Sequence, residues 1–120
     1  MPVPRITKEE LKQLLDADPG AVAVVDARLK YPYEHSTVRL PGAVRFTPGS
    51  TGLPAVPRER ELVIYDSDPE EVTARSTAVV LLKLGYRVRV LEGGIAAWVG
   101  ASLPVETKDA PKPAAAVAKS

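Results

Sequence analysis

The 120-residue sequence contains no cysteine. This absence excludes disulfide bonds, thiolate metal sites, cysteine nucleophiles and reaction intermediates that carry sulfur on a cysteine. Long apolar runs are also missing: no uninterrupted stretch approaches the roughly 20 residues that a membrane-spanning helix needs, and residues 1–5 lack the apolar centre of a secretory signal. We therefore expect a soluble, cytoplasmic protein without membrane contact, or a periplasmic one if a signal peptide was removed.

An excess of charge of either sign is missing as well. Sixteen lysines and arginines against fifteen acidic residues give a net charge of +1, and the basic residues are scattered along the chain. Without a strong overall field, the chain is not expected to attract nucleic acid. Its length and its hydrophobic content of 45% are typical of one globular domain, which we expect to be a monomer.

The clearest structural signal lies between residues 62 and 85. Leu62 to Tyr65 is a short apolar, β-branched and aromatic run, which predicts a strand buried on both faces. The sequence Asp68-Pro69-Glu70-Glu71 has an N-cap residue, proline at the first helical position and an acid at the third. Because the next strong stop signal is Gly85, this pattern predicts a helix from Pro69 to Leu84.

The remaining elements follow from capping, turn and periodicity signals. They are a helix from Lys8 to about Asp16 after a capping box at Thr7, a strand over Ala21–Val25, a helical turn at Tyr33–His35, an extended piece at Val44–Phe46, a loop over Thr47–Pro57, a strand over Arg87–Val90 and a short helix over Ile95–Trp98. The alternation of strands and helices predicts a parallel sheet with helices on both faces. We expect one domain over residues 1–106 and a disordered tail, rich in alanine, proline and lysine, over 107–120.

Four stretches between Ile6 and Glu106 resemble the rhodanese-like domains. They are VVDAR at residues 24–28, RLPGAV at 39–44, DSDPEEVTA at 66–74, and LEGGIAAW followed by SLPVE at the end of the domain. The resemblance implies a single α/β domain with a parallel sheet of about five strands. It also implies an active-site cysteine at the end of the central strand, in a loop of backbone N–H groups, where the cysteine carries sulfur as a persulfide.

The chain departs from the family at the positions that would carry this chemistry. Alignment of LVIYD with the family's central strand puts Asp66 at the cysteine position, and Asp68 stands where a longer variant of the loop has a second cysteine. Arg39 stands where the family commonly has histidine. The resemblance assigns the following residues to the active-site loop: Asp66, Ser67, Asp68, Pro69, Glu70, Glu71, Val72, Thr73 and Ala74.

An aspartate in this loop has a different chemistry from a cysteine. A carboxylate can accept the hydrogen bonds that would favour a thiolate, but it cannot hold a transferable sulfur through an S–S bond. We predict that Asp66 is a resident anion of the loop, with its pKa lowered by these hydrogen bonds. Asp68, Glu70 and Glu71 should make the loop repel anionic substrates, unless an arginine compensates for their charge.

Ordinary structural roles compete with functional ones at these positions. Asp68 fits an N-cap, Glu70 and Glu71 fit acids of a first helical turn, and Asp66 itself fits a residue that orders the loop. The candidates for contact with an anion or for ion pairs are Asp26, Arg28, Arg39 and Arg75. Asp26 and Arg28 are interpreted as a structural ion pair, His35 as a surface residue and Trp98 as part of the core.

Several functions remain open at this point. The first is a catalytically inactive rhodanese-like module that needs no cofactor and binds a protein or a small molecule. The second is a phosphohydrolase with Asp66 as nucleophile, because D-x-D after a strand also occurs in haloacid-dehalogenase-like enzymes that use magnesium. A third is a weak divalent cation site at Asp66, Asp68, Glu70 and Glu71. An active sulfurtransferase stays possible if the two aspartates are engineered replacements of cysteines.

Overall fold

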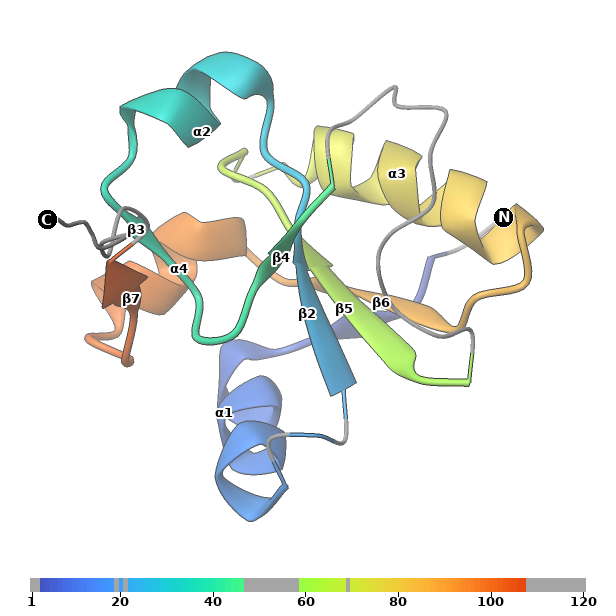
Figure 1. Ribbon diagram of the computed structural model, residues 1–120, viewed down its shortest axis with the longest axis horizontal. Coiled ribbons are helices and arrows are strands. Elements are labelled where there is room, and N and C mark those ends of the chain that lie inside the picture. The colour runs from blue at the N-terminus through green and yellow to red at the C-terminus, as the bar shows by residue number, and fades with distance from the viewer. Residues whose placement is uncertain (1–2, 19, 21, 47–58, 69, 108–120) are drawn as a thin grey trace, which may run out of the picture.

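The protein is described by a computed structural model that covers residues 3–18, 20, 22–46, 59–68 and 70–107. The predicted loop over Thr47–Pro57 lies outside the described residues, as does the predicted tail apart from Thr107. The elements, in chain order, are β1 (Arg5–Ile6), α1 (Lys8–Ala17), β2 (Val22–Asp26), α2 (Lys30–His35), β3 (Val38–Arg39), β4 (Val44–Arg45), β5 (Glu61–Tyr65), α3 (Val72–Lys83), β6 (Val88–Leu91), α4 (Gly94–Gly100) and β7 (Glu106–Thr107) (Figure 1).

The main sheet has five parallel strands in the order β1-β6-β5-β2-β4. β5 lies in the middle, next to β2 on one side and β6 on the other. The four residues Leu62–Tyr65 are fully buried, which confirms the prediction of a strand that is covered on both faces. The predicted parallel sheet is also confirmed, with a strand number equal to that implied by the resemblance.

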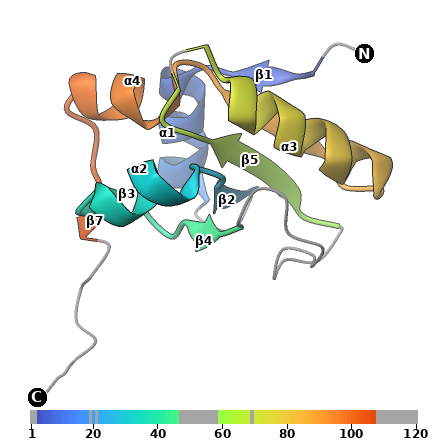
Figure 2. The same ribbon diagram turned by 90° about the horizontal axis from the view of Figure 1, so that it is seen from above.

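Successive residues of the central strands point to opposite faces and so enter two separate cores. Ile64 of β5 packs with α3, in one cluster with Ala78 and Leu81. Val63 and Tyr65 belong to the other cluster, which contains residues of α1 and α4, including the fully buried Trp98. Helices therefore cover both faces, as predicted, and α1 and α3 lie on opposite sides of the sheet (Figures 1 and 2).

The start of α3 differs from the prediction. The helix begins at Val72, its N-cap is Glu71 in the left-handed conformation with a φ of 61°, and it ends at Lys83. The Glu71 N–H donates to the Asp68 backbone oxygen at 2.9 Å, which closes a turn ahead of the helix. The Asp68 carboxylate does accept backbone N–H groups, but it caps this turn and not a helix that starts at Pro69.

Three short strands carried no sequence signal and were not predicted. β1 is a two-residue strand that pairs with β6, and β3 forms an antiparallel two-stranded sheet with β7. Thr107, assigned to the tail by its composition, is the second residue of β7. The capping box before α1 is confirmed, since Thr7 and Glu10 exchange hydrogen bonds of 3.0 and 3.1 Å. In the part of the chain that the structure describes, no helix has the length and hydrophobicity to span a membrane.

Candidate functional site

The candidate site lies at the carboxyl end of β5, in the middle of the parallel sheet. Asp66 is the first residue after this strand, and only 1% of its surface is exposed. Its backbone oxygen accepts the N–H of Ile95 from the first turn of α4 at 2.9 Å. Ligands of open α/β sheets bind at this edge, so the backbone places Asp66 where a functional group would stand.

The carboxylates of Asp66 and Asp68 occupy the N–H groups of their own loop. Asp66 accepts the N–H of Asp68 at 3.2 Å through Oδ1 and that of Ala74 at 2.7 Å through Oδ2. Asp68 accepts the N–H of Glu70 at 2.9 Å through Oδ1 and that of Val72 at 3.3 Å through Oδ2. The carboxylates of Asp66 and Asp68 thus satisfy the alternate amides of residues 68, 70, 72 and 74.

The expectation of a lowered pKa for Asp66 is wrong. Burial raises the pKa of the Asp66 carboxyl, and this effect exceeds the lowering by the hydrogen bonds from Ala74 and Asp68. The negative charges of Asp68 and Glu71 raise it further. The prediction considered the amides of the loop, but it left out the cost of removing the carboxylate from water.

Glu71 is not an ordinary acid of a first helical turn. It is 4% exposed, and its carboxylate accepts two bonds from Arg5, at 3.0 Å from Nε and 2.7 Å from Nη2. It also accepts the N–H of Gly93 at 3.0 Å. Burial raises the pKa of Glu71, but the bonds from Arg5 and Gly93 outweigh burial and lower it overall. Arg5 is a site residue that the sequence analysis missed.

The two glycines after β6 allow the turn before α4 to touch the loop. Gly94 has a φ of +63°, and a Cβ at this position would lie 2.4 Å from the Asp66 backbone oxygen. Any side chain there would displace the backbone of Asp66, and the left-handed conformation further favours glycine. Gly93 has a φ of +78° and donates its N–H to Glu71. The turn thus supports the loop at both Asp66 and Glu71.

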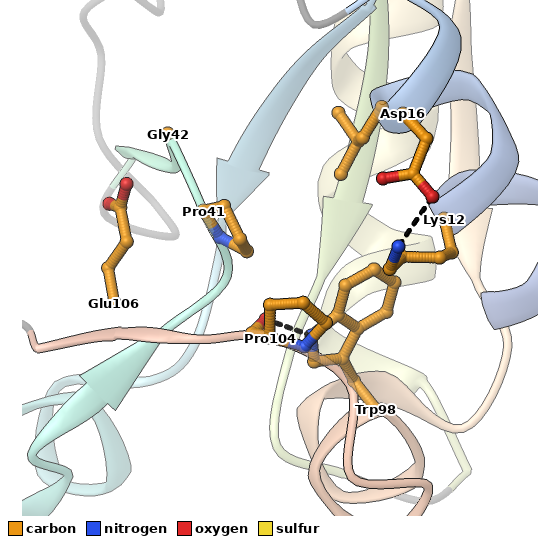
Figure 3. A pocket seen from close by; sticks show the side chains of 8 residues that line it. Lys12, Asp16, Pro41, Gly42, Trp98, Pro104 and Glu106 are labelled. Atoms are coloured by element: carbon orange, nitrogen blue, oxygen red, sulfur yellow. Dashed lines mark hydrogen bonds and ion pairs between the residues drawn. The ribbon is translucent and has the colours of Figure 1, made fainter.

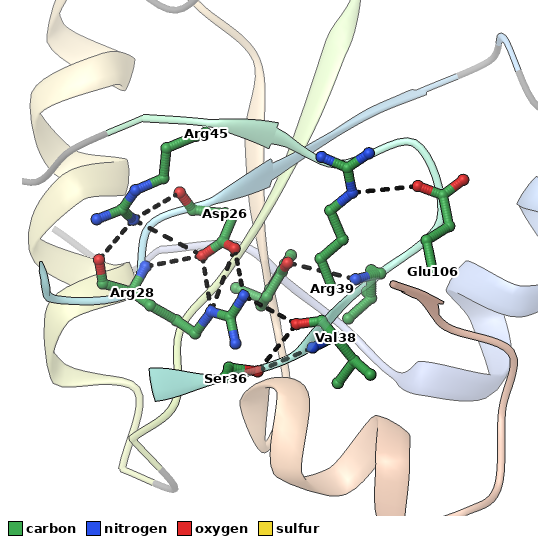
Figure 4. Close-up of polar contacts among 9 residues, drawn as sticks. Asp26, Arg28, Ser36, Val38, Arg39, Arg45 and Glu106 are labelled. Carbon is green, nitrogen blue, oxygen red and sulfur yellow. Dashed lines mark hydrogen bonds and ion pairs between the residues drawn. The ribbon is translucent and has the colours of Figure 1, made fainter. Parts of the chain in front are cut away.

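The predicted ion pair between Asp26 and Arg28 is confirmed, and it is fully buried. The Arg28 guanidinium donates to the Asp26 carboxylate at 2.7 Å from Nη2 and 3.0 Å from Nε, and to the Val38 backbone oxygen at 3.1 Å. Burial lowers the pKa of Arg28, but the bonds to Asp26 raise it more. Arg45 lies on the other side of Asp26 and donates to the Arg28 backbone oxygen at 2.5 Å (Figure 4).

The other two candidate arginines are also engaged elsewhere. Arg39 pairs with Glu106 of β7 at 3.2 Å, in a partly exposed ion pair (Figure 4). Arg75 donates to the backbone oxygens of Glu70 at 2.7 Å and Glu71 at 3.3 Å. Among the ion pairs of the described residues, only Arg5 reaches an acidic side chain of the loop. Arg5 is therefore the arginine that forms the ion pair expected to compensate the negative charge of the loop.

The hypothesis of a divalent cation site is wrong for the part of the chain described. No group of three or more histidine and acidic side chains could hold a metal ion there. The Asp66 carboxylate is turned to the amides of Asp68 and Ala74, while the Glu71 carboxylate is turned to Arg5. The acids that are close in the sequence therefore do not converge.

A hollow of about 420 Å³ lies away from this loop. Its lining includes Lys12, Asp16, Pro41, Trp98, Pro104 and Glu106 (Figure 3). Lys12 and Asp16 are paired at 2.5 Å, and Trp98 donates its indole N–H to the Pro104 backbone oxygen at 2.7 Å. None of the lining residues belongs to the loop of residues 66–74.

Asp66 and Glu71 should give opposite dependences of stability on pH. The pKa of Asp66 is raised on folding, so the folded state binds its proton more tightly and its contribution to stability improves as the pH falls through the folded pKa. The pKa of Glu71 is lowered, so its contribution is lost as the pH falls below the unfolded pKa.

Urea unfolding from about pH 7 to about pH 3 measures both effects. Relative to Asp66→Asn, the wild type should gain stability with acidification, and relative to Glu71→Gln it should lose stability. Differences of the same sign would contradict the assignment.

Comparison with known proteins relates this fold and site to a protein family. A family model described as the rhodanese-like domain matches residues 7–101, while a search of curated proteins found no match.

Similar solved structures include a full-length protein from Lactobacillus plantarum, with a TM-score of 0.75, 23% identity and coverage of 86% of this chain and 87% of that one. A rhodanese-related protein from Thermoplasma volcanium has a TM-score of 0.69 and 17% identity, and the match covers 86% of this chain and 97% of that one. A thiosulfate sulfurtransferase from Pseudomonas aeruginosa has a TM-score of 0.69 and 22% identity, with 91% of this chain and 20% of that one covered. The fold of these neighbours and the match of the family model agree, and the chain belongs to the rhodanese-like domain family.

Proposed function

We propose that this rhodanese-like domain has no sulfurtransferase activity and serves as a binding module. The proposal rests on the hydrogen bonds by which the carboxylates of Asp66 and Asp68 accept the backbone N–H groups of the loop. In a sulfurtransferase of this family, the loop would stabilise a thiolate and the persulfide that it forms. Here the N–H groups already bind fixed carboxylates, which cannot form the S–S bond that sulfur transfer requires.

The charge of the loop restricts the kind of ligand that the module would bind. Glu71 is neutralised by Arg5, which leaves Asp66, Asp68 and the exposed Glu70 as acids without an ion pair among the described residues. An anionic ligand would compete with these carboxylates for the amides and would meet their negative charge. We therefore expect the partner protein or small molecule to present a neutral or positively charged face to the loop.

The phosphohydrolase hypothesis gains no support from the geometry. A nucleophilic carboxylate needs an oxygen that can approach phosphorus, but both oxygens of Asp66 accept backbone N–H groups and the residue is 1% exposed. The described residues also contain no cluster that could hold the magnesium ion. These observations favour a loop-ordering role for the Asp66 carboxylate over a catalytic one.

A thiosulfate:cyanide sulfurtransferase assay tests the proposed lack of activity. Purified protein should form thiocyanate no faster than a buffer blank, because it lacks the nucleophile that would accept sulfur. An active sulfurtransferase assayed under the same conditions is the positive control. Turnover that rises in proportion to the amount of protein and stays with it through a second purification step would overturn the proposal.

A further inference from the structure

We propose that the N-terminal strand controls the active-site loop, because Arg5 positions Glu71 and so holds the loop in its self-occupied form. The inference concerns regulation of the proposed binding site and rests on that proposal for its functional meaning. Its structural basis is a contact between residues 66 positions apart in the sequence. β1 lies at the edge of the sheet, and its Arg5 side chain reaches the residue that precedes α3.

The Glu71 carboxylate joins three segments of the chain. It accepts two bonds from Arg5 of β1 and one from the N–H of Gly93 in the turn after β6. Its own backbone continues the loop, since the Glu71 N–H donates to Asp68 and its oxygen accepts the N–H of Arg75. A shift of this one side chain would therefore disturb β1, the glycine turn and the turn that begins at Asp68.

The self-occupied form of the loop places Glu71 in an unfavourable state that the contact with Arg5 stabilises. Glu71 has a φ of 61°, in the left-handed region that is unfavourable for a residue with a side chain. Without Arg5, its carboxylate would also remain buried without an ion-pair partner, which is strongly unfavourable. The pair with Arg5 offsets both penalties. Loss of the pair should therefore favour forms of the loop in which Glu71 leaves its site.

Arg5 can be reached from outside, while Glu71 cannot. The Arg5 side chain is 48% exposed, against 5% for that of Glu71. β1 has only two residues, which pair with Val90 and Leu91 on one side only. An acidic group of a partner could thus bind Arg5 at the edge of the sheet, without first opening the loop. Such a partner would remove the cation from Glu71 and loosen the loop.

Hydrogen exchange measured by NMR on the full chain tests this coupling directly. In Arg5→Ala, the amides of Asp68 and Ala74, both bound to Asp66, should exchange about tenfold faster or more relative to the core amides of Val63 and Ile64. Arg5→Lys keeps the charge and should restore part of the protection. The matched control is Arg39→Ala, which removes another partly exposed arginine–glutamate pair away from the loop.

The outcomes separate a positioning role from a merely structural one. If loop and core amides accelerate equally in Arg5→Ala, or if Arg39→Ala has the same effect on the loop, the proposal is wrong. If Arg5→Ala does not fold, the same comparison with Arg5→Gln decides. Exchange does not depend on sulfur transfer, so a failure here leaves the proposed function standing. Sulfurtransferase activity of the wild type would in turn leave the coupling of Arg5 to the loop intact.

Discussion

Replacing Arg28 by alanine should lower the free energy of unfolding by about 3–5 kcal/mol, because it leaves a buried carboxylate without its main cation. Asp26 and Arg28 are each 1% exposed. The guanidinium makes bonds of 2.7 and 3.0 Å to the Asp26 carboxylate and one of 3.1 Å to the Val38 backbone oxygen. Arg45, the other nearby cation, lies 3.7 Å from Asp26 and donates mainly to backbone oxygens.

Urea unfolding monitored by Trp98 fluorescence measures this loss. Arg39→Ala is the matched control, because its pair with Glu106 is partly exposed and should contribute only about 0–1 kcal/mol. Arg28→Lys should fall between the two, since lysine keeps the charge but loses the two-pronged contact. If Arg28→Ala is no less stable than Arg39→Ala, the pair of Asp26 and Arg28 does not contribute the stability expected of a buried ion pair.

The middle of the fold could be predicted because each element carried its own signal. The runs that became β2 and β5 are apolar at nearly every position, as strands covered on both faces require. The helix α1 was marked by a local capping box. By contrast, β1, β3 and β7 have two residues each and depend on pairing with distant segments. These strands are too short to show a periodic pattern of apolar residues, so they could not be recognised in the sequence.

Prediction of the candidate site from the sequence was limited in the same way. The sequence indicated Asp66 and its loop because they follow a strongly predicted strand, but local patterns misplaced the start of α3. Proline and acids suit a first helical turn, whereas the left-handed Glu71 delays the helix to Val72. The carboxylate of Glu71 is bound by Arg5 and Gly93, which lie 66 and 22 positions away. No pattern within the loop could reveal either contact, and hence the burial of Glu71 was missed.

Replacing Asp66 by cysteine should give the domain a thiosulfate:cyanide sulfurtransferase activity well above that of the wild type. The introduced thiolate would attack the outer sulfur of thiosulfate and form a persulfide, while sulfite leaves with the electrons of the broken S–S bond. Cyanide would then take the outer sulfur as thiocyanate and regenerate the thiolate. The amides of Asp68 and Ala74, which now bind the Asp66 carboxylate, are placed to stabilise this thiolate.

The matched control is Ser67→Cys, which places a thiol one residue further along and outside the position held by these amides. Asp66→Cys should exceed it in rate by about tenfold or more, since only the former aligns the nucleophile with the loop. Adding Asp68→Asn should raise the rate again at low salt, because it removes a charge that repels thiosulfate. Mass spectrometry after incubation with thiosulfate should find one extra sulfur atom on Asp66→Cys and none on the wild type. Equal rates for the two cysteine variants would mean that the loop does not position a thiolate at residue 66 for sulfur transfer.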